Sequence, residues 1–171
     1  DTFISQGISV IKGKAYFLDN QTISIGSARF TAKDFVIATG SDLVLPEIAG
    51  LSKAGFLTHK EAIDLIRPPK NLAVIGGGET GVEFAQLFAI FGSKVTIVES
   101  SGSLIGSEEP ETSKLIENRF RKEYGMSILL NTNVTSVSKS GLKRSLQLAR
   151  GSKTGQLVVD EILLATGKQA V

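Results

Sequence analysis

The chain has 171 residues, of which 42% are hydrophobic and 21% are charged, and its net charge is +2. This is the composition of an ordinary globular protein with one domain or slightly more. The sequence has no cysteine, which excludes disulfides, thiolate catalysis and Cys-ligated metals within these residues, and the single His59 cannot build a metal site or a triad alone.

The charges and the apolar runs also limit the partners. The lysines and arginines are scattered, so we expect no nucleic-acid partner despite a pI near 8.9. No apolar run approaches the ~18 residues that a membrane helix needs, so we expect no membrane partner. The start of the chain shows no signal-peptide pattern, so we expect a cytoplasmic protein, with an organellar location left open. We expect no metal site.

The first third of the chain is rich in short β-type segments. Alternating apolar residues and the turn signal at Asp19 and Asn20 predict antiparallel strands between residues 7 and 30. Pro46 disfavours helix in the residue before it, so residues 45–50 are expected to be irregular. The strands of this region are predicted over residues 7–11, 15–18, 22–25 and 34–38.

A short helix follows. Thr58 and Glu61 form a capping box that opens a helix over residues 60–66, which the two prolines at 68 and 69 end. His59 falls in the first turn of this helix, where we interpret it as a surface residue.

Another predicted helix follows the βαβ region (residues 71–99). The acidic residues 108–111, with a proline among them, indicate its start, and Gly125 indicates its end. A buried strand is expected over residues 126–130. The period-two pattern after it predicts a three-stranded antiparallel meander, with strands around residues 134–137, 142–148 and 157–164.

Residues 71–99 carry the strongest signal, because they have the order strand, glycine turn, helix, strand and acid of a dinucleotide-binding βαβ unit. Gly76 sits at the tight turn, Gly78 allows a pyrophosphate to approach the backbone, and Gly81 allows the helix to pack on the strand. The helix begins near Glu79, so its N–H groups and its positive dipole end face the phosphates. A purely structural βαβ unit is the alternative.

Glu99 ends the second strand of this unit, 23 positions after Gly76. An acid near this offset accepts hydrogen bonds from the ribose hydroxyls and repels a 2′-phosphate. Residues 100–103 contain no Arg or Lys that would hold such a phosphate. The local chemistry therefore favours NAD over NADP.

Two nearly identical phrases divide the chain. Residues 35–40 and 162–167 both end in Ala-Thr-Gly, and the second returns the chain to the sheet that begins at residue 71. The first has no GxGxxG before it, so we expect the chain to begin inside a first nucleotide-binding domain. The expected division is the last strands of this first nucleotide-binding domain (1–50), a linker with a short helix (51–70), an NAD-binding domain (71–167) and the start of a return to the first domain (168–171).

The sequence closely resembles the central part of the pyridine nucleotide–disulfide oxidoreductases, the flavoprotein disulfide reductases that include dihydrolipoamide dehydrogenase, glutathione reductase and mercuric reductase. The matching phrases span nearly the whole chain in the family's order. They are residues 11–15 (IKGKA), 38–41 (ATGS) with Pro46 and Gly50 after it, 76–83 (GxGxxGxE) and 164–168 (LATGK).

The resemblance implies a fold and site residues by position. The fold is α/β: a Rossmann-like NAD-binding domain, with a parallel sheet, helices and the meander, preceded by a β-rich remnant of an FAD-binding domain. Glu83 would lie by the nicotinamide and pair with a lysine of the flavin domain; its alternative role is a helix N-terminal acid. The other NAD contacts would be Gly76, Gly77, Gly78, Glu79, Thr80, Gly81, Glu99 (ribose), Val134 (adenine) and Gly167 (nicotinamide end), and the FAD contacts Ala15, Thr39, Gly40 and Ser41.

The resemblance also implies a function for the parent protein: hydride transfer between NADH and FAD, with a dithiol, disulfide or related acceptor, as in dihydrolipoamide dehydrogenase. The parent is expected to form a homodimer through a domain absent from these residues, and the chain alone is expected to be inactive. Glu79 and Thr80 replace a tyrosine or apolar pair, which raises the question whether Glu79 weakens NAD binding. The alternatives are a stand-alone redox-sensing or docking module, and a family member without a redox cysteine pair, of the NADH oxidase or ferredoxin reductase type.

Overall fold

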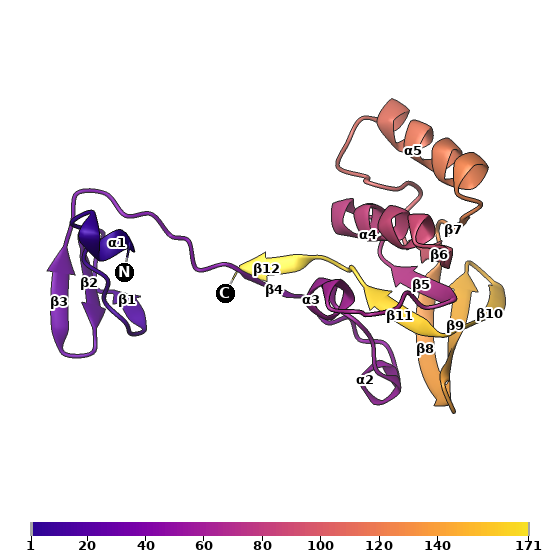
Figure 1. The fold of residues 1–171 in the computed structure, drawn as a ribbon, viewed down its shortest axis with the longest axis horizontal. Helices are drawn as coiled ribbons and strands as arrows, with labels where there is room; N and C mark the ends of the chain where they lie inside the picture. Colours follow the sequence, from indigo (N-terminus) through magenta and orange to yellow (C-terminus); the bar gives the residue numbers. More distant parts are fainter. Residues whose placement is uncertain (1, 171) are drawn as a thin grey trace. The chain divides into compact units, whose positions relative to one another are not determined.

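The computed structural model describes residues 2–170, and the chain divides into two compact units, residues 1–39 and 40–171 (Figure 1). The first unit contains a short helix α1 (Thr2–Ser5) and a three-stranded antiparallel sheet. The strands follow each other in the sheet as β1 (Ala15–Phe17), β2 (Thr22–Ile25) and β3 (Ala28–Thr31). None of its described residues is buried.

The structure corrects two of the strands predicted in this unit. Residues 7–11 form a turn and an irregular segment, with Gly7 in the left-handed region (φ 80°). Residues 34–38 are also irregular, and Val36 and Ile37 are 93% and 71% exposed. A strand is stable only when its backbone groups pair with a neighbour. No ladder in the described chain includes residues 34–38, so the apolar pattern alone does not make them a strand.

The second unit is built on a four-stranded parallel sheet with the order β11-β5-β6-β7. Its strands are β5 (Asn71–Ile75), β6 (Lys94–Val98), β7 (Ser127–Leu129) and β11 (Glu161–Leu164). The chain runs from β5 to β6 to β7, and later places β11 on the other side of β5. The direction of strand order therefore reverses at β5, which is where ligands bind in open α/β sheets.

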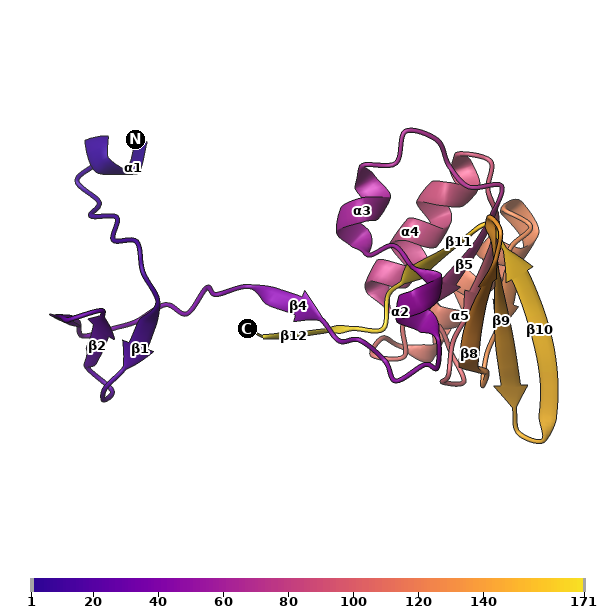
Figure 2. The same cartoon turned by 90° about the horizontal axis from the view of Figure 1, so that it is seen from below.

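Two helices cover one face of this sheet, α4 (Glu79–Ile90) and α5 (Pro110–Glu123). Leu72 and Val74 of β5 pack beneath them, whereas Ala73 and Ile75 of the same strand join the core on the opposite face. This alternation is the two-residue period of a strand that is buried on both faces. Figure 2 shows α4 and the meander on opposite sides of β5.

The opposite face is covered by an antiparallel meander and by helix α2 (Leu51–Ala54). The meander consists of β8 (Asn133–Ser140), β9 (Lys143–Arg150) and β10 (Lys153–Val159) in the order β10-β9-β8. The prediction of a meander and of a mixed α/β fold is therefore confirmed. The last predicted strand, 157–164, is instead two strands, because the chain bends at Asp160 and β11 leaves the meander for the parallel sheet.

Two smaller features complete the second unit. The predicted capping box is present at α3 (His59–Ile63), where Glu61 Oε2 accepts from the Thr58 N–H at 2.8 Å. The helix ends three residues earlier than expected. Strands β4 (Ser41–Leu43) and β12 (Lys168–Ala170) pair in an antiparallel ribbon. No helix in residues 2–170 is long and apolar enough to cross a membrane.

Asp160 joins the meander to the parallel sheet. Its Oδ2 accepts from the Asn71 backbone N–H at 2.8 Å and from the Asn71 side-chain amide at 2.9 Å, and its Oδ1 pairs with Lys143. The Lys143 hydrogen bond, helped by Asn71, lowers the pKa of Asp160 to about 2. Arg144 reinforces the junction by pairing with Glu161 at 2.8 Å.

We predict that Asp160→Asn lowers the free energy of unfolding by about 1 kcal/mol at pH 7, because hydrogen bonds to a charged group are lost. A carboxyl with a lowered pKa stabilises the fold fully above its unfolded value near 3.8 and loses that contribution as the pH falls toward about 2. Denaturant unfolding at several pH values should therefore show the difference from wild type shrinking across this interval.

Glu123→Gln is the matched control, because its pair with Arg119 is more than half exposed on both sides and surface pairs contribute little. An Asp160→Asn variant as stable as wild type at pH 7 would contradict the proposed role of this junction.

Candidate functional site

A pocket of about 520 Å³ opens where β5, β6 and β11 end. Ile75, Val98 and Leu164 line it, and each is the last residue of its strand. The carboxyl edge of a parallel sheet beside the point of reversed strand order is the usual ligand position of this architecture. Of the predicted NAD contacts, the pocket brings together Gly76, Gly78, Glu79, Thr80, Glu99, Val134 and Gly167.

The glycine turn between β5 and α4 is shaped by a close backbone approach. Gly76 has φ 106°, and a Cβ there would lie 2.3 Å from the Ala165 carbonyl oxygen. A Cβ on Gly81 would lie 2.0 Å from the Gly76 carbonyl oxygen. These contacts press the first turn of α4 against the ends of β5 and β11, which only residues without a Cβ permit.

Gly78 has the opposite environment. A Cβ at this position would meet no described atom within 4 Å beyond its chain neighbours, and its backbone (φ −74°, ψ −173°) suits any residue. The fold therefore does not require glycine here. An open position at the N-terminus of a helix, on the wall of a pocket, fits close approach of a ligand phosphate to the backbone.

Glu99 is held in the pocket by three donors. Its Oε2 accepts from the Gly77 N–H at 2.6 Å, and its Oε1 accepts from the Ser101 N–H at 2.6 Å and from Ser100 Oγ at 3.2 Å. Burial raises the pKa of this carboxyl, but the hydrogen bonds from Ser101, Gly77 and Ser100 outweigh burial and leave the pKa below its ordinary value. Glu99 is therefore ionised at neutral pH and fixed in orientation.

Gly77 contributes to this arrangement without lining the pocket. A Cβ on Gly77 would meet Leu104 Cδ2 at 2.6 Å and the Cβ and Cγ of Glu99 at 3.2 Å. The absence of a side chain at Gly77 thus allows Glu99 to reach the backbone of the turn.

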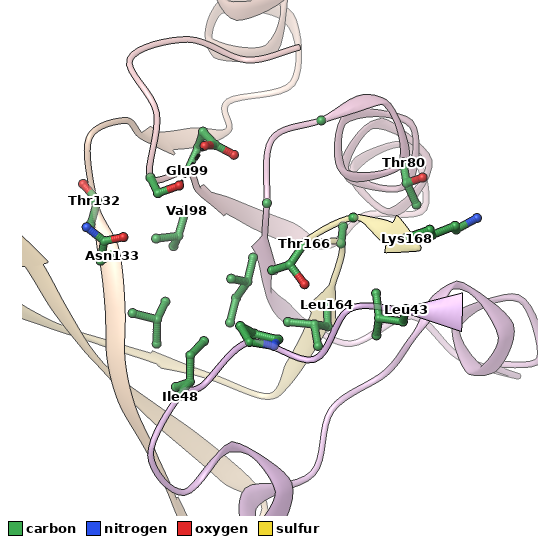
Figure 3. A pocket seen from close by; sticks show the side chains of 18 of the residues that line it. Leu43, Ile48, Thr80, Val98, Glu99, Thr132, Asn133, Leu164, Thr166 and Lys168 are labelled. Atoms are coloured by element: carbon green, nitrogen blue, oxygen red, sulfur yellow. Dashed lines mark hydrogen bonds between the residues drawn. The ribbon is translucent and has the colours of Figure 1, made fainter. Parts of the chain in front are cut away.

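The pocket has two chemically different ends. Figure 3 shows Glu99, Thr132 and Asn133 on one side and Thr80 and Lys168 on the other. On the first side, a backbone hydrogen bond joins the segments of Glu99 and Thr132, because the Thr132 N–H donates to the Glu99 carbonyl at 2.9 Å. On the second side, Thr166 Oγ1 donates to the Val44 carbonyl at 2.9 Å, next to the β4–β12 ribbon.

Glu79 places another carboxylate on the pocket wall. It is the first residue of α4, it is exposed, and its Oε1 accepts from Ser107 Oγ at 2.9 Å. The hydrogen bonds from its own N–H and from Ser107 lower the pKa of this carboxyl, so it is ionised at neutral pH. Together with Glu47 and Glu99, it brings the number of glutamates that line a pocket predicted to hold a diphosphate to three.

Several predicted site residues lie outside this pocket. Glu83 is exposed on α4 and does not line it, and Gly81 is buried behind it. The four residues predicted to contact FAD are also not among its lining residues: Ala15 and Thr39 belong to the first unit, and Gly40 and Ser41 begin the second.

The pocket also includes residues that the sequence did not indicate. His59 lines it and is only partly exposed, whereas the sequence placed it on a surface helix. The Leu57 N–H donates to the Ile162 carbonyl, and the Leu164 N–H donates to the Leu57 carbonyl, both at 2.8 Å. This pairing between distant segments brings the start of α3 to β11, and the capping box, a local signal, carries no information about it.

The model of the family described as pyridine nucleotide-disulphide oxidoreductase matches residues 2–171 of the chain. A mercuric reductase from Lysinibacillus sphaericus is 35% identical over 170 residues, covering 99% of this chain and 31% of the relative. A mercuric reductase from Staphylococcus aureus is 31% identical over 169 residues, with the same two coverages. The chain therefore spans about a third of the length of these curated relatives.

Solved structures agree with this match. The HOCl-induced flavoprotein disulfide reductase RclA from Escherichia coli superimposes with a TM-score of 0.75 at 32% identity, covering 96% of this chain and 37% of that one. The fold, the family model and the curated relatives all indicate the same family. The chain belongs to the FAD-dependent pyridine nucleotide–disulfide oxidoreductase family.

Proposed function

We propose that residues 71–167 are the NAD(H)-binding segment of a flavin-dependent oxidoreductase. The observation that carries the proposal is the contrast among the glycines of the turn. Gly76 and Gly81 are required by backbone contacts, whereas Gly78 faces open space at the start of α4, inside the pocket. A glycine that the fold does not need, at a helix N-terminus, is suited to a bound diphosphate.

In this proposal the dinucleotide lies across the carboxyl edge of the sheet. The adenosine occupies the end formed by Glu99 and Asn133, with Val134 next in the chain, and the nicotinamide occupies the end that contains Thr80 and Lys168, with Gly167 just before it in the chain. An ionised carboxylate accepts about four hydrogen bonds, and three donors already bind Glu99. One ribose hydroxyl therefore binds Glu99 directly, and a second binds when the Ser100 hydroxyl turns away.

The family uses FAD together with a pyridine nucleotide. The flavin, when bound in the parent protein, supplies the redox chemistry, and this segment binds and orients the nicotinamide. Glu83 is exposed on α4 and is thus accessible to a cation of a flavin domain, as its assigned role requires. Ala15, Thr39, Gly40 and Ser41 are proposed FAD contacts of the parent.

The acceptor class is proposed from the relatives. Their names describe mercuric reductases and a flavoprotein disulfide reductase. We propose a thiol, disulfide or related soft acceptor for the parent, with dihydrolipoamide as one candidate. A cysteine pair elsewhere in the parent sequence would support this acceptor, and its absence would favour the NADH oxidase or ferredoxin reductase type.

Gly78→Ala tests the proposed diphosphate position. The added methyl group meets open space in the protein but occupies the ligand's approach to the backbone, so we expect NADH affinity to fall by at least about tenfold while stability is retained. Isothermal titration with NADH and thermal unfolding measure the two effects.

Two glycines provide matched controls. Gly81→Ala should lower stability by about 1–3 kcal/mol, because its Cβ overlaps the Gly76 carbonyl. Gly155→Ala, in open space on β10, should change neither binding nor stability appreciably. NADH affinity unchanged by Gly78→Ala would contradict the proposed site.

Glu99→Ala tests the choice of nucleotide. Loss of the carboxylate removes hydrogen bonds to the ribose and the repulsion of a 2′-phosphate, so the preference for NADH over NADPH should narrow by about tenfold. Titrations with both nucleotides give the ratio of the NADH and NADPH affinities. Thermal unfolding measures how much stability is lost with the hydrogen bonds from Gly77 and Ser101. Tighter binding of NADPH than of NADH by the unaltered chain would overturn the assigned role of Glu99.

A further inference from the structure

Glu79 occupies the place where the positive end of α4 meets the pocket. The N-cap residue of this helix is Gly78, which has no side chain to accept a hydrogen bond from the first turn. The first N–H groups of a helix lack partners within the helix and attract negative charge. The Glu79 carboxylate supplies that charge from within the chain, in the region where the proposed ligand would supply it with a diphosphate.

Ser107 restrains this carboxylate. Its hydroxyl donates to Glu79 Oε1 at 2.9 Å and so connects the start of α4 with the loop between β6 and α5. A free glutamate at an exposed helix end samples many rotamers, but a hydrogen bond to a fixed partner keeps the charge at the pocket wall.

The loop before Ser107 is anchored on the glycine turn. Leu104 and Ile105 are buried, and the Ile105 N–H donates to the Gly77 carbonyl at 2.7 Å. Ile105 has φ 41°, a left-handed conformation that is costly for a β-branched residue and persists only when surrounding contacts impose it. The position of Ser107, two residues later, is thus set by the same turn that would bind the diphosphate.

We propose that Glu79 is an intramolecular competitor of the ligand's diphosphate, held at the start of α4 by Ser107, and that it limits the affinity of the site. The inference rests on the proposed function. A dinucleotide must displace the Glu79 carboxylate or bind beside it against charge repulsion. A ligand without phosphate, such as adenosine, does neither and should be insensitive to Glu79.

Glu79→Gln is expected to tighten NADH binding by about fivefold at low ionic strength, with most of the gain lost near 1 M salt because the charges are exposed. Adenosine binding should not change. Ser107→Ala should tighten NADH binding by a smaller factor and should have no effect in the Glu79→Gln background, because the serine acts through the carboxylate. Isothermal titration of the 171-residue chain measures all four forms.

Glu111→Gln is the matched control, since it removes an exposed carboxylate from the first turn of α5, away from the pocket. If the wild-type chain binds NADH and Glu79→Gln leaves that affinity unchanged or lowers it, this inference alone is overturned. Equal tightening of adenosine and NADH would also overturn it. An effect of Ser107→Ala that persists without Glu79 would remove the proposed role of the serine. Failure of every form to bind NADH would overturn both this inference and the proposed function.

Discussion

The architecture of the site depends on one close approach among three backbone segments. The end of β5, the first turn of α4 and the end of β11 meet at Gly76, Gly81 and Ala165, where a Cβ on either glycine would lie within 2.3 Å of a carbonyl oxygen. This contact directs the start of α4 at the carboxyl edge of the sheet. The pocket follows from it, because Glu99, directly after β6, and Asn133, at the start of β8, lie along the same edge.

The same turn determines the electrostatics of the pocket. Gly77 donates its N–H to Glu99 and accepts from Ile105 through its carbonyl oxygen, so one peptide segment fixes both the ribose acid and the loop that restrains Glu79. The site thus combines an attractive element, the N-terminus of α4, with the carboxylates of Glu99 and Glu79, both of which are held by hydrogen bonds. The proposed affinity for a dinucleotide therefore depends on the attraction of the helix N-terminus and on the repulsion by the carboxylates. The diphosphate binds less tightly than it would at a helix N-terminus without a carboxylate beside it.

The sequence predicted what depends on local chemistry. Residues 71–99 have the periodicity and glycine spacing of a βαβ unit, and this unit is present in the structure. The meander and the Thr58 capping box are also predicted from short stretches of sequence, and both are present. The failures concern pairing at a distance. The apolar run at Val36 and Ile37 predicts a strand, but strand formation depends on a neighbour. The local pattern at His59 predicts the helix but not the pairing of Leu57 with β11 that brings this residue to the pocket. The Glu79–Ser107 bond spans 28 residues and leaves no trace in a linear pattern.

Titration of the isotope-labelled chain with NADH, followed by amide chemical shifts, tests most directly whether the pocket binds a dinucleotide. We expect saturable shifts concentrated at residues 76–80, 99–101, 133–134 and 167, with weaker binding of NADPH. Shifts that do not saturate, or that leave the glycine turn between β5 and α4 unchanged, would contradict the proposed site.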